Sequence, residues 1–271
     1  MELLEFLNTN RIHSKNGVFY LSEPGPYLPQ EKAFHELKEK EGHLYSDEEL
    51  RSLPDLDPQH PWHRDWLKRK NILIRLEKYF LKKLKKIPPP IKILDLGSGN
   101  GWMANWMTTR LPSETWAFDI NRQELETGSR LFHNNHNLKF FYGNIFKDPL
   151  PEDYFHFILM SGTTQYFYNL TPLFQRLMSL LKKGGEIHII ESPWYSKHAQ
   201  HQAKKTSQIY YQQLGLPQMV SFYFYHTYRG IILPFHRLYH PQSFYNKIIS
   251  FFQRRSSSAY PWLRLTKSNS S

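Results

Sequence analysis

The sequence predicts an α/β fold in which hydrophobic strands alternate with helices, and three observations support this prediction. A β-branched and aliphatic segment, residues 91–96, passes directly into a glycine-rich turn. Further apolar segments follow it at the spacing of strands that are separated by helices. Before it, hydrophobic residues recur at helical spacing through residues 68–86, and this pattern ends at consecutive prolines.

The turn after the first predicted strand follows Asp95 and carries glycines at alternate positions, Gly97, Gly99 and Gly101. Because glycine lacks a Cβ atom, the backbone can approach a ligand closely and adopt a positive φ. Amide groups at the start of the next helix then become available to that ligand. A dinucleotide dehydrogenase has G-x-G-x-x-G here, but Trp102 occupies the position of its third glycine. The pattern is D-x-G-x-G-x-G, and a purely structural turn is the alternative.

This pattern resembles the first motif of the class I S-adenosylmethionine-dependent methyltransferases, which have a Rossmann-like fold. The resemblance implies a doubly wound, mostly parallel seven-stranded sheet, preceded here by an N-terminal extension. It also implies that S-adenosyl-L-methionine is the cofactor. The residues expected to bind it in the turn are Asp95, Gly97, Ser98, Gly99, Asn100 and Gly101.

The second predicted strand, residues 115–120, ends in an acidic residue, Asp119. A carboxylate at this point can accept hydrogen bonds from both hydroxyls of a ribose. The alternative is a helix N-cap, a role that suits both Asp119 and Asn121. The resemblance favours the ribose contact, and Ile120 is expected to contact the cofactor beside it.

The third predicted strand, residues 138–142, leads into Gly143, Asn144 and Ile145. The resemblance implies that this turn places a polar side chain against the amino group of an adenine and an apolar side chain on its face. Asn144 and Ile145 suit these two roles, although aspartate is commoner than asparagine at this point of the family.

The fourth and fifth predicted strands, within residues 155–160 and 180–191, bring loops to the edge where open α/β sheets bind ligands. The loop at residues 161–166 lacks the Asn/Asp-Pro-Pro-aromatic signature of methyltransferases that act on amino groups of adenine or glutamine. It also lacks the aspartate of metal-dependent catechol methyltransferases, so both subclasses are disfavoured. Ser161 is expected to bind the cofactor. Candidates for acceptor binding are Gln165, Tyr166, Trp194 and Tyr195, and aromatic packing is an alternative for the last two.

No catalytic base is assigned, because an activated methyl group needs a base only when the acceptor is a hydroxyl or a protonated amine. No metal site is predicted either. His60 and His63 lie three residues apart without a third ligand nearby, so packing with Trp62 and Trp66 is favoured over metal binding.

Charge is distributed unevenly along the chain. The formal net charge is +11, and residues 192–271 contain ten Lys or Arg, 17 aromatic residues and no Asp or Glu. Such a segment suits a small anionic substrate, a polyanion such as RNA, or a membrane surface, and ordinary packing is the alternative. We therefore predict methyl transfer to an O or N atom of a small acceptor, for which an anionic group is one option. The alternatives are a methyltransferase acting on RNA or another polyanion, and a non-catalytic cofactor-binding module.

Composition excludes several classes of protein. The absence of cysteine excludes disulfides, thiolate zinc sites and covalent attack by a thiolate. The longest uncharged run, residues 206–228, is broken by Gly215 and Pro217, so no membrane span is predicted. With no basic, apolar leader at its start, the chain is expected to be cytoplasmic. The oligomeric state is not predicted.

The predicted organisation is an N-terminal extension, residues 1–60, followed by the methyltransferase domain, residues 61–271. The domain has a core at 91–195 and a basic, aromatic-rich part at 196–271. The resemblance suggests that the extension folds over the cofactor as a lid. Within the C-terminal part, we expect helices at 196–213 and 241–252, an antiparallel strand pair at 223–228 and 262–265, and a frayed tail at 267–271.

Overall fold

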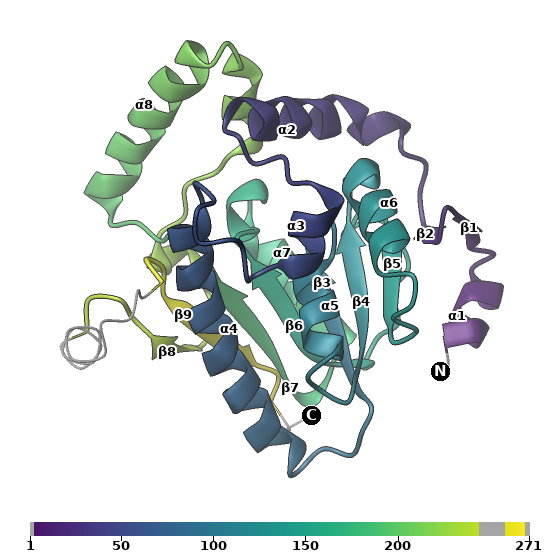
Figure 1. Ribbon diagram of the computed structural model, residues 1–271. Helices are drawn as coiled ribbons and strands as arrows, with labels where there is room; N and C mark the ends of the chain where they lie inside the picture. The colour runs from purple at the N-terminus through teal and green to yellow at the C-terminus, as the bar shows by residue number, and fades with distance from the viewer. Residues whose placement is uncertain (1–2, 244–257, 269–271) are drawn as a thin grey trace.

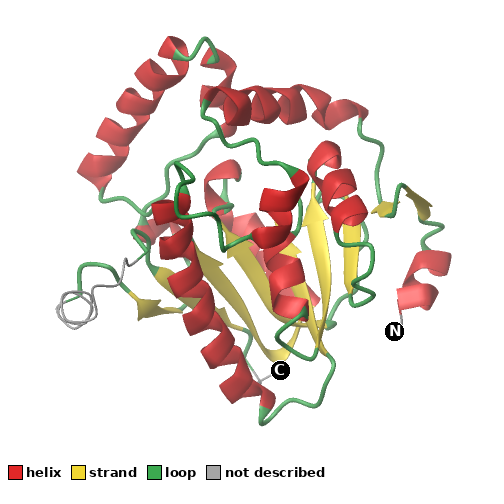
Figure 2. Ribbon diagram, in the orientation of Figure 1, coloured by secondary structure: helices red, strands yellow, loops and turns green. Residues whose placement is uncertain are grey.

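The computed structural model describes residues 3–243 and 258–268 and has three layers, a central sheet with helices on both faces (Figure 2). The strands are β1 (His13–Lys15), β2 (Val18–Tyr20), β3 (Ile91–Leu96), β4 (Ser113–Asp119), β5 (Leu138–Tyr142), β6 (Phe155–Ser161), β7 (Leu181–Ile190), β8 (Phe235–Tyr239) and β9 (Trp262–Thr266). The α-helices are α1 (Leu3–Thr9), α2 (Leu28–Lys40), α3 (Asp47–Ser52), α4 (His63–Leu84), α5 (Trp102–Thr108), α6 (Arg122–Leu131), α7 (Leu170–Leu180) and α8 (Lys197–Gln213). Short 3₁₀ helices are η1 (Gly25–Tyr27), η2 (Thr164–Tyr166), η3 (Pro217–Phe222) and η4 (Tyr228–Gly230).

The predicted doubly wound, mostly parallel sheet is confirmed. The strand order is β1-β2-β5-β4-β3-β6-β7-β9-β8, and the five central strands from β5 to β7 are parallel. The strand order reverses beside β3, where Asp95 has Ala117 of β4 on one side and Leu159 of β6 on the other. Ligands of such sheets bind at this switch point, outside the carboxyl ends of the strands.

Within the described residues, the sheet has nine strands instead of the predicted seven, because an N-terminal hairpin extends it. β1 and β2 are antiparallel, and β2 lies parallel to β5. The turn between them is Asn16-Gly17, with φ values of 52° and 74°. Positive φ at both central residues is the geometry of a tight two-residue hairpin, for which Asn-Gly is the strongest short sequence signal. That signal was available in the sequence and could have predicted the hairpin.

The last antiparallel pair also differs from the prediction. The strand predicted at 262–265 is present as β9 and runs antiparallel to β7, but its other antiparallel partner is β8 and not residues 223–228. Residues 223–228 instead cross the ends of the strands, where the Phe224 amide donates to the Gln165 carbonyl (2.7 Å) and Thr227 forms an isolated bridge with Tyr195. The segment is extended, but it pairs with no strand of the described residues. Its aromatic side chains pack on the edge of the sheet formed by the strand ends.

Two predictions concern the end of the chain. Most of the helix predicted at 241–252 lies outside the described residues. At the tail, Lys267 is not frayed: its amide donates to the Gly185 carbonyl (2.9 Å) and its ammonium to Asp153 (2.6 Å). Residues 269–271 lie outside the described part of the chain.

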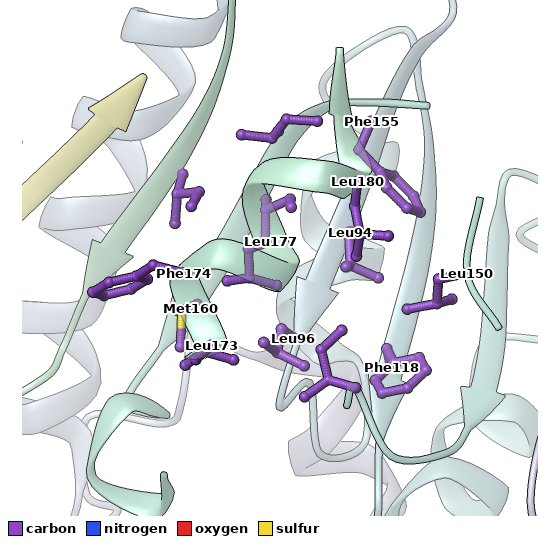
Figure 3. Packing of buried hydrophobic residues seen from close by; sticks show 14 of the residues in the cluster. Leu94, Leu96, Phe118, Leu150, Phe155, Met160, Leu173, Phe174, Leu177 and Leu180 are labelled. Atoms are coloured by element: carbon purple, nitrogen blue, oxygen red, sulfur yellow. The ribbon is translucent and has the colours of Figure 1, made fainter. Parts of the chain in front are cut away.

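Hydrophobic side chains fill both faces of the sheet. On one face, Leu94 and Met160 from the strands meet Leu173 and Leu177 of α7 (Figure 3). On the other face lies α4, whose amphipathic pattern is confirmed: its buried positions include Phe80, the ring of which lies 4.4 Å from that of Phe157. Burying a side chain of this size contributes roughly 1.5–3 kcal/mol.

The cluster before α4 serves packing. His60 accepts a hydrogen bond from the Trp62 amide (3.1 Å) through Nδ1, and its Nε2 lies 3.4 Å from Glu49. His63 contacts the Leu56 carbonyl through Nδ1 (2.8 Å). Both histidines therefore have partners within the N-terminal part of the chain.

Above the carboxyl edge of the sheet, two segments far apart in sequence form one layer, which we call the cover: α2, α8 and η3 (Figure 1). They share a small core that contains Ala33 and Leu37 of α2 together with Tyr211 and Met219. Polar contacts join the same segments, because the Tyr210 hydroxyl donates to Glu41 (2.7 Å). Among the described helices, α8 and α2 included, none has the length and apolar composition that crossing a bilayer requires.

Candidate active site

Three adjoining cavities lie along the carboxyl edge of the central strands, with volumes of about 340, 380 and 650 Å³. The first cavity lies over the ends of β3, β4 and β5 and is covered by α2. The second lies between the glycine turn, the ends of β6 and β7, and α4. Gly97, Gly99 and Tyr166 line both of these, so the two are neighbours across the glycine turn. The third lies under the N-terminal segment, and Tyr166 borders it too.

The three glycines of the turn have different tasks. All adopt positive φ, at 74° for Gly97, 55° for Gly99 and 71° for Gly101. A Cβ atom at Gly97 would lie 2.4 Å from the Thr163 side chain, and one at Gly101 would lie 2.6 Å from Phe140. At Gly99 the nearest atom, a carboxylate oxygen of Glu124, would be 3.5 Å away. Gly97 and Gly101 therefore permit close packing, whereas Gly99 is the glycine with room for a ligand beside it.

Asp119 closes β4 and faces the first cavity. One carboxylate oxygen accepts the Gly99 amide and the other accepts the Asn121 amide, both at 2.8 Å. Asn121 is the N-cap of α6, because its side chain accepts the Glu124 amide (3.1 Å). The N-cap role considered for Asp119 is thus filled by its neighbour. Burial raises the pKa of Asp119, and the two amide hydrogen bonds oppose that effect.

Asp95 is the most deeply buried carboxylate of the site, with 1% exposure. Neither of its oxygens has a hydrogen-bond partner among the described residues, although it lines the second cavity. Burial, together with repulsion from Asp119, raises the pKa of Asp95 to about 8. An orphaned buried carboxyl group of this kind suits a ligand that brings a positive charge or hydrogen-bond donors.

The predicted adenine-side residues lie at the other end of the first cavity. Ile145 is buried, and Ile120 lines the cavity next to Asp119. Asn144 accepts the Phe146 amide (2.9 Å) and donates to the hydroxyl of Tyr27 (2.8 Å). The side chain that the resemblance assigned to the purine is therefore also tied to the N-terminal extension.

Helix α2 supplies a wall that sequence reasoning did not assign residue by residue. Glu31 is buried and accepts the amide of Arg122 (3.3 Å), and the Lys38 ammonium donates to Glu124 (2.7 Å). Phe34 packs edge-on against the ring of Tyr166, with centroids 4.8 Å apart. These residues join α2 to α6 and η2 directly above the glycine turn. The partners of these residues lie far away in sequence, so no local sequence motif predicts the contacts.

The acceptor candidates divide into two groups. Gln165 and Tyr166 line the second cavity, next to Ser98, Asn100 and Ser161 of the expected cofactor site. Trp194 and Tyr195 lie beside the cavities instead of lining them: the Trp194 ring stacks on that of Tyr228 (5.7 Å), and the Tyr195 amide donates to the His226 carbonyl (2.9 Å). Gly101 likewise lies behind the lining, at the start of α5.

The far end of the second cavity contains residues absent from the predicted set: Arg69, Glu191, Tyr223 and Tyr260. Glu191 directly follows β7, and its place in the sequence, on the loop after the fifth predicted strand, predicts this position at the carboxyl edge of the sheet. The two tyrosines and Arg69 come from other parts of the chain, and nothing in their local sequence marks them.

The fold and this arrangement resemble those of the class I, Rossmann-like methyltransferases, the type that uses S-adenosyl-L-methionine. Residues 93–185 match the family model described as a methyltransferase domain. In sequence, the chain is 25% identical over 122 residues to a ubiquinone/menaquinone biosynthesis C-methyltransferase from Laribacter hongkongensis, a match covering 44% of this chain. It spans half of the length of that relative.

Solved structures show the same fold at low sequence identity. A geranyl diphosphate C-methyltransferase from Streptomyces coelicolor, crystallised with Mg²⁺, a substrate analogue and S-adenosyl-L-homocysteine, has a TM-score of 0.52 and 15% identity. The similarity covers 79% of this chain and 83% of that one. The YcgJ protein from Bacillus subtilis has a TM-score of 0.53 and 12% identity, covering 72% of this chain and all of that one.

Proposed function

We propose that this protein transfers a methyl group from S-adenosyl-L-methionine to an O or N atom of a small acceptor. The observation that carries the proposal is the buried Asp95 carboxyl group, which has no partner among the described residues and lines the same cavity as Gly99. A nucleoside with a cationic amino-acid tail would match both the unpaired carboxyl group and the open space beside Gly99. When bound, the cofactor supplies a methyl group that is already activated on a sulfonium.

Each part of the cofactor has a complementary group in this chain. Asp119 suits the ribose hydroxyls, because carboxylate oxygens that already accept one amide each retain lone pairs for further donors. Asn144 and Ile145 suit the polar edge and the face of the purine. Asp95 suits the ammonium group of the tail, and Arg69, which lines the same cavity, suits its carboxylate.

The protein's remaining tasks are alignment of the acceptor and exclusion of water. The cover supports both, since α2 lies over the first cavity and contacts η2 through Phe34 and Tyr166. Tyr166 borders all three cavities. Burial raises the pKa of its hydroxyl, so at neutral pH Tyr166 donates a hydrogen bond and does not act as a base.

The lining of the second cavity favours a neutral or cationic acceptor over an anionic one. Three carboxylates, Asp95, Glu124 and Glu191, line it. Of its cations, Lys38 already pairs with Glu124 (2.7 Å), and Arg69, 3.9 Å from Glu191, is the one assigned to the cofactor carboxylate. The lysines of α8, which belong to the basic C-terminal segment that motivated the polyanion alternative, are exposed.

The test is isothermal calorimetry with S-adenosyl-L-homocysteine. Replacing Asp119 by Ala removes the proposed ribose contact and should weaken binding by about 1.5–3 kcal/mol, the range for a hydrogen bond to a charged group. Asp57→Ala, at an exposed position in the N-terminal extension, is the matched control and should bind like the wild type. If Asp119→Ala binds with unchanged affinity, the ribose assignment is wrong. If the wild-type protein ignores the nucleoside at millimolar concentration, the proposed function is wrong.

A further inference from the structure

We propose that the far end of the second cavity is a subsite for a protonated amine, so that the acceptor is an amine methylated on nitrogen. We define this amine subsite by Gln165, Glu191, Tyr223 and Tyr260, with Tyr166 at its border to the cofactor side. The inference rests on the proposed function and narrows its substrate class.

Glu191 provides the negative charge of the amine subsite. It follows β7 in the left-handed conformation, with a φ of 53°, which is uncommon for a residue other than glycine. One carboxylate oxygen accepts the Ser258 hydroxyl (2.7 Å), which fixes the group, and its side chain is 14% exposed. The other oxygen lies 3.9 Å from Arg69, beyond hydrogen-bond distance, and the Arg69 guanidinium lies over the Trp66 ring at 4.6 Å. The charge of Glu191 is therefore only partly offset.

Gln165 provides a second acceptor. The residue is 8% exposed, and its amide nitrogen donates to the Gly162 carbonyl, which orients the side chain. Its amide oxygen is buried and has no partner among the described residues. Leaving such an atom unpaired costs roughly 1–3 kcal/mol, so a ligand that brings an N–H or O–H donor gains from it.

Tyrosine rings complete the subsite. Tyr166 and Tyr223 meet edge to face with centroids 6.1 Å apart, and Tyr260 lines the same cavity. The face of an aromatic ring attracts cations through its quadrupole. Burial raises the pKa values of Tyr166 and Tyr223, so both hydroxyls stay neutral and add no negative charge of their own.

These groups together select the chemistry of the acceptor. Glu191, Gln165 and the ring faces offer hydrogen-bond acceptors and attraction for positive charge, which an alkylammonium group matches. A carboxylate or phosphate would lie against Glu191 and bring no donor, while an alcohol brings a donor but no charge.

Glu191 can also accept the proton that the ammonium group of the acceptor must lose. An ammonium group has no free lone pair, so it must lose a proton before it can react. The proton moves to the Glu191 carboxylate, and the freed lone pair on nitrogen forms the bond to the methyl carbon. The electron pair of the broken carbon–sulfur bond stays on sulfur. The products are the methylated ammonium ion, neutral Glu191 and neutral S-adenosyl-L-homocysteine, so the net charge of +1 is conserved.

The experiment uses the full chain saturated with S-adenosyl-L-homocysteine and three probes of similar shape: benzylamine, benzyl alcohol and benzoate. Calorimetry should show benzylamine binding about tenfold or more tightly than the other two, as expected of charge-assisted hydrogen bonds. Glu191→Gln keeps the shape of the side chain but removes its charge, and it should abolish this preference. Glu152→Gln, at an exposed surface position, is the matched control and should retain it.

A second variant guards against an indirect effect of the first. Gln165→Met conserves volume and removes the unpaired oxygen, so it should reduce benzylamine affinity by a smaller factor, with thermal unfolding confirming that both variants fold. Equal binding of the three probes, tighter binding of benzoate, or no binding of benzylamine up to about 10 mM would each overturn the proposal. Because S-adenosyl-L-homocysteine binding is measured in the same samples, failure of the proposed function would be seen separately.

Discussion

The first cavity is formed largely by residues at the ends of neighbouring strands, whereas the amine subsite is assembled from separate parts of the chain. Gly97, Asp119 and Asn144 each lie at the end of a strand, or within two residues after it, in one continuous α/β unit. Glu191 and Tyr260, by contrast, meet only because the C-terminal segment returns to the sheet. The comparison teaches that the proposed cofactor half of the site is encoded by local motifs, and the proposed acceptor half by tertiary packing.

The strongest test of this contrast targets a glycine outside every motif. Gly128 lies in α6, and a Cβ atom there would lie 2.0 Å from the backbone oxygen of Asn100 and 2.7 Å from Phe140. Gly128→Ala should therefore push the glycine turn out of place. We expect a loss of roughly 3 kcal/mol of unfolding free energy, at the upper end of the range for overpacking, and a large loss of S-adenosyl-L-homocysteine affinity.

Chemical denaturation and calorimetry measure the two effects. Gly230→Ala is the matched control, because a Cβ atom at Gly230 has no neighbour within 4 Å. A Gly128→Ala protein that loses stability but binds the nucleoside like the wild type would show that the position of the turn does not affect nucleoside binding. In that case the glycine turn would not belong to the proposed cofactor half of the site.

The same contrast explains what the sequence could predict. The apolar strands and the glycine spacing predicted the parallel sheet and the positions of Asp95, Gly99 and Asp119 at its carboxyl edge, because strand ends and turns follow local rules. Trp194 was chosen on equally local grounds, as a loop residue after a strand, but its ring stacks on Tyr228.

The misses share one physical cause. Lys38 and Glu124 pair across 86 positions, and Phe34 meets Tyr166 only after α2 folds over the sheet. Neither pairing leaves a periodic trace in the sequence. The N-terminal hairpin is different, because its Asn-Gly turn is a local signal that could have been used.

A second prediction concerns the protonation of Asp95 in the proposed cofactor half of the site. The carboxyl group of Asp95 has a pKa of about 8 in the folded protein, against an ordinary value of 3.8, because it is buried and Asp119 lies nearby. A folded-state pKa raised in this way lowers stability as pH increases from about 4 to about 8, since only the unfolded chain ionises there. An ammonium group beside Asp95 would favour its ionised form. Binding of S-adenosyl-L-homocysteine at pH 7 should then release up to about one proton.

Calorimetry in buffers that differ in ionisation enthalpy counts these protons. In Asp95→Asn the release should disappear, and the cofactor-free variant should lose less stability than the wild type over the same pH range. Asp57→Asn, at an exposed position, should behave like the wild type in both respects. Proton uptake by the wild type, or unchanged release in Asp95→Asn, would place the ammonium group elsewhere.

The smallest effect concerns the cover, which joins the two halves. Lys38 anchors α2 to Glu124 beside the glycine turn, while Lys32 on the same helix points outward, 80% exposed and 3.9 Å from Glu36. If residues 1–60 act as a lid, S-adenosyl-L-homocysteine should protect them from limited proteolysis. Lys38→Met should reduce that protection by no more than about 1 kcal/mol, the scale of a partly exposed ion pair. Lys32→Met should leave the protection unchanged. Cleavage that is equally fast with and without the nucleoside would show that α2 is a fixed wall, and the cover would then shape the acceptor cavity without opening or closing.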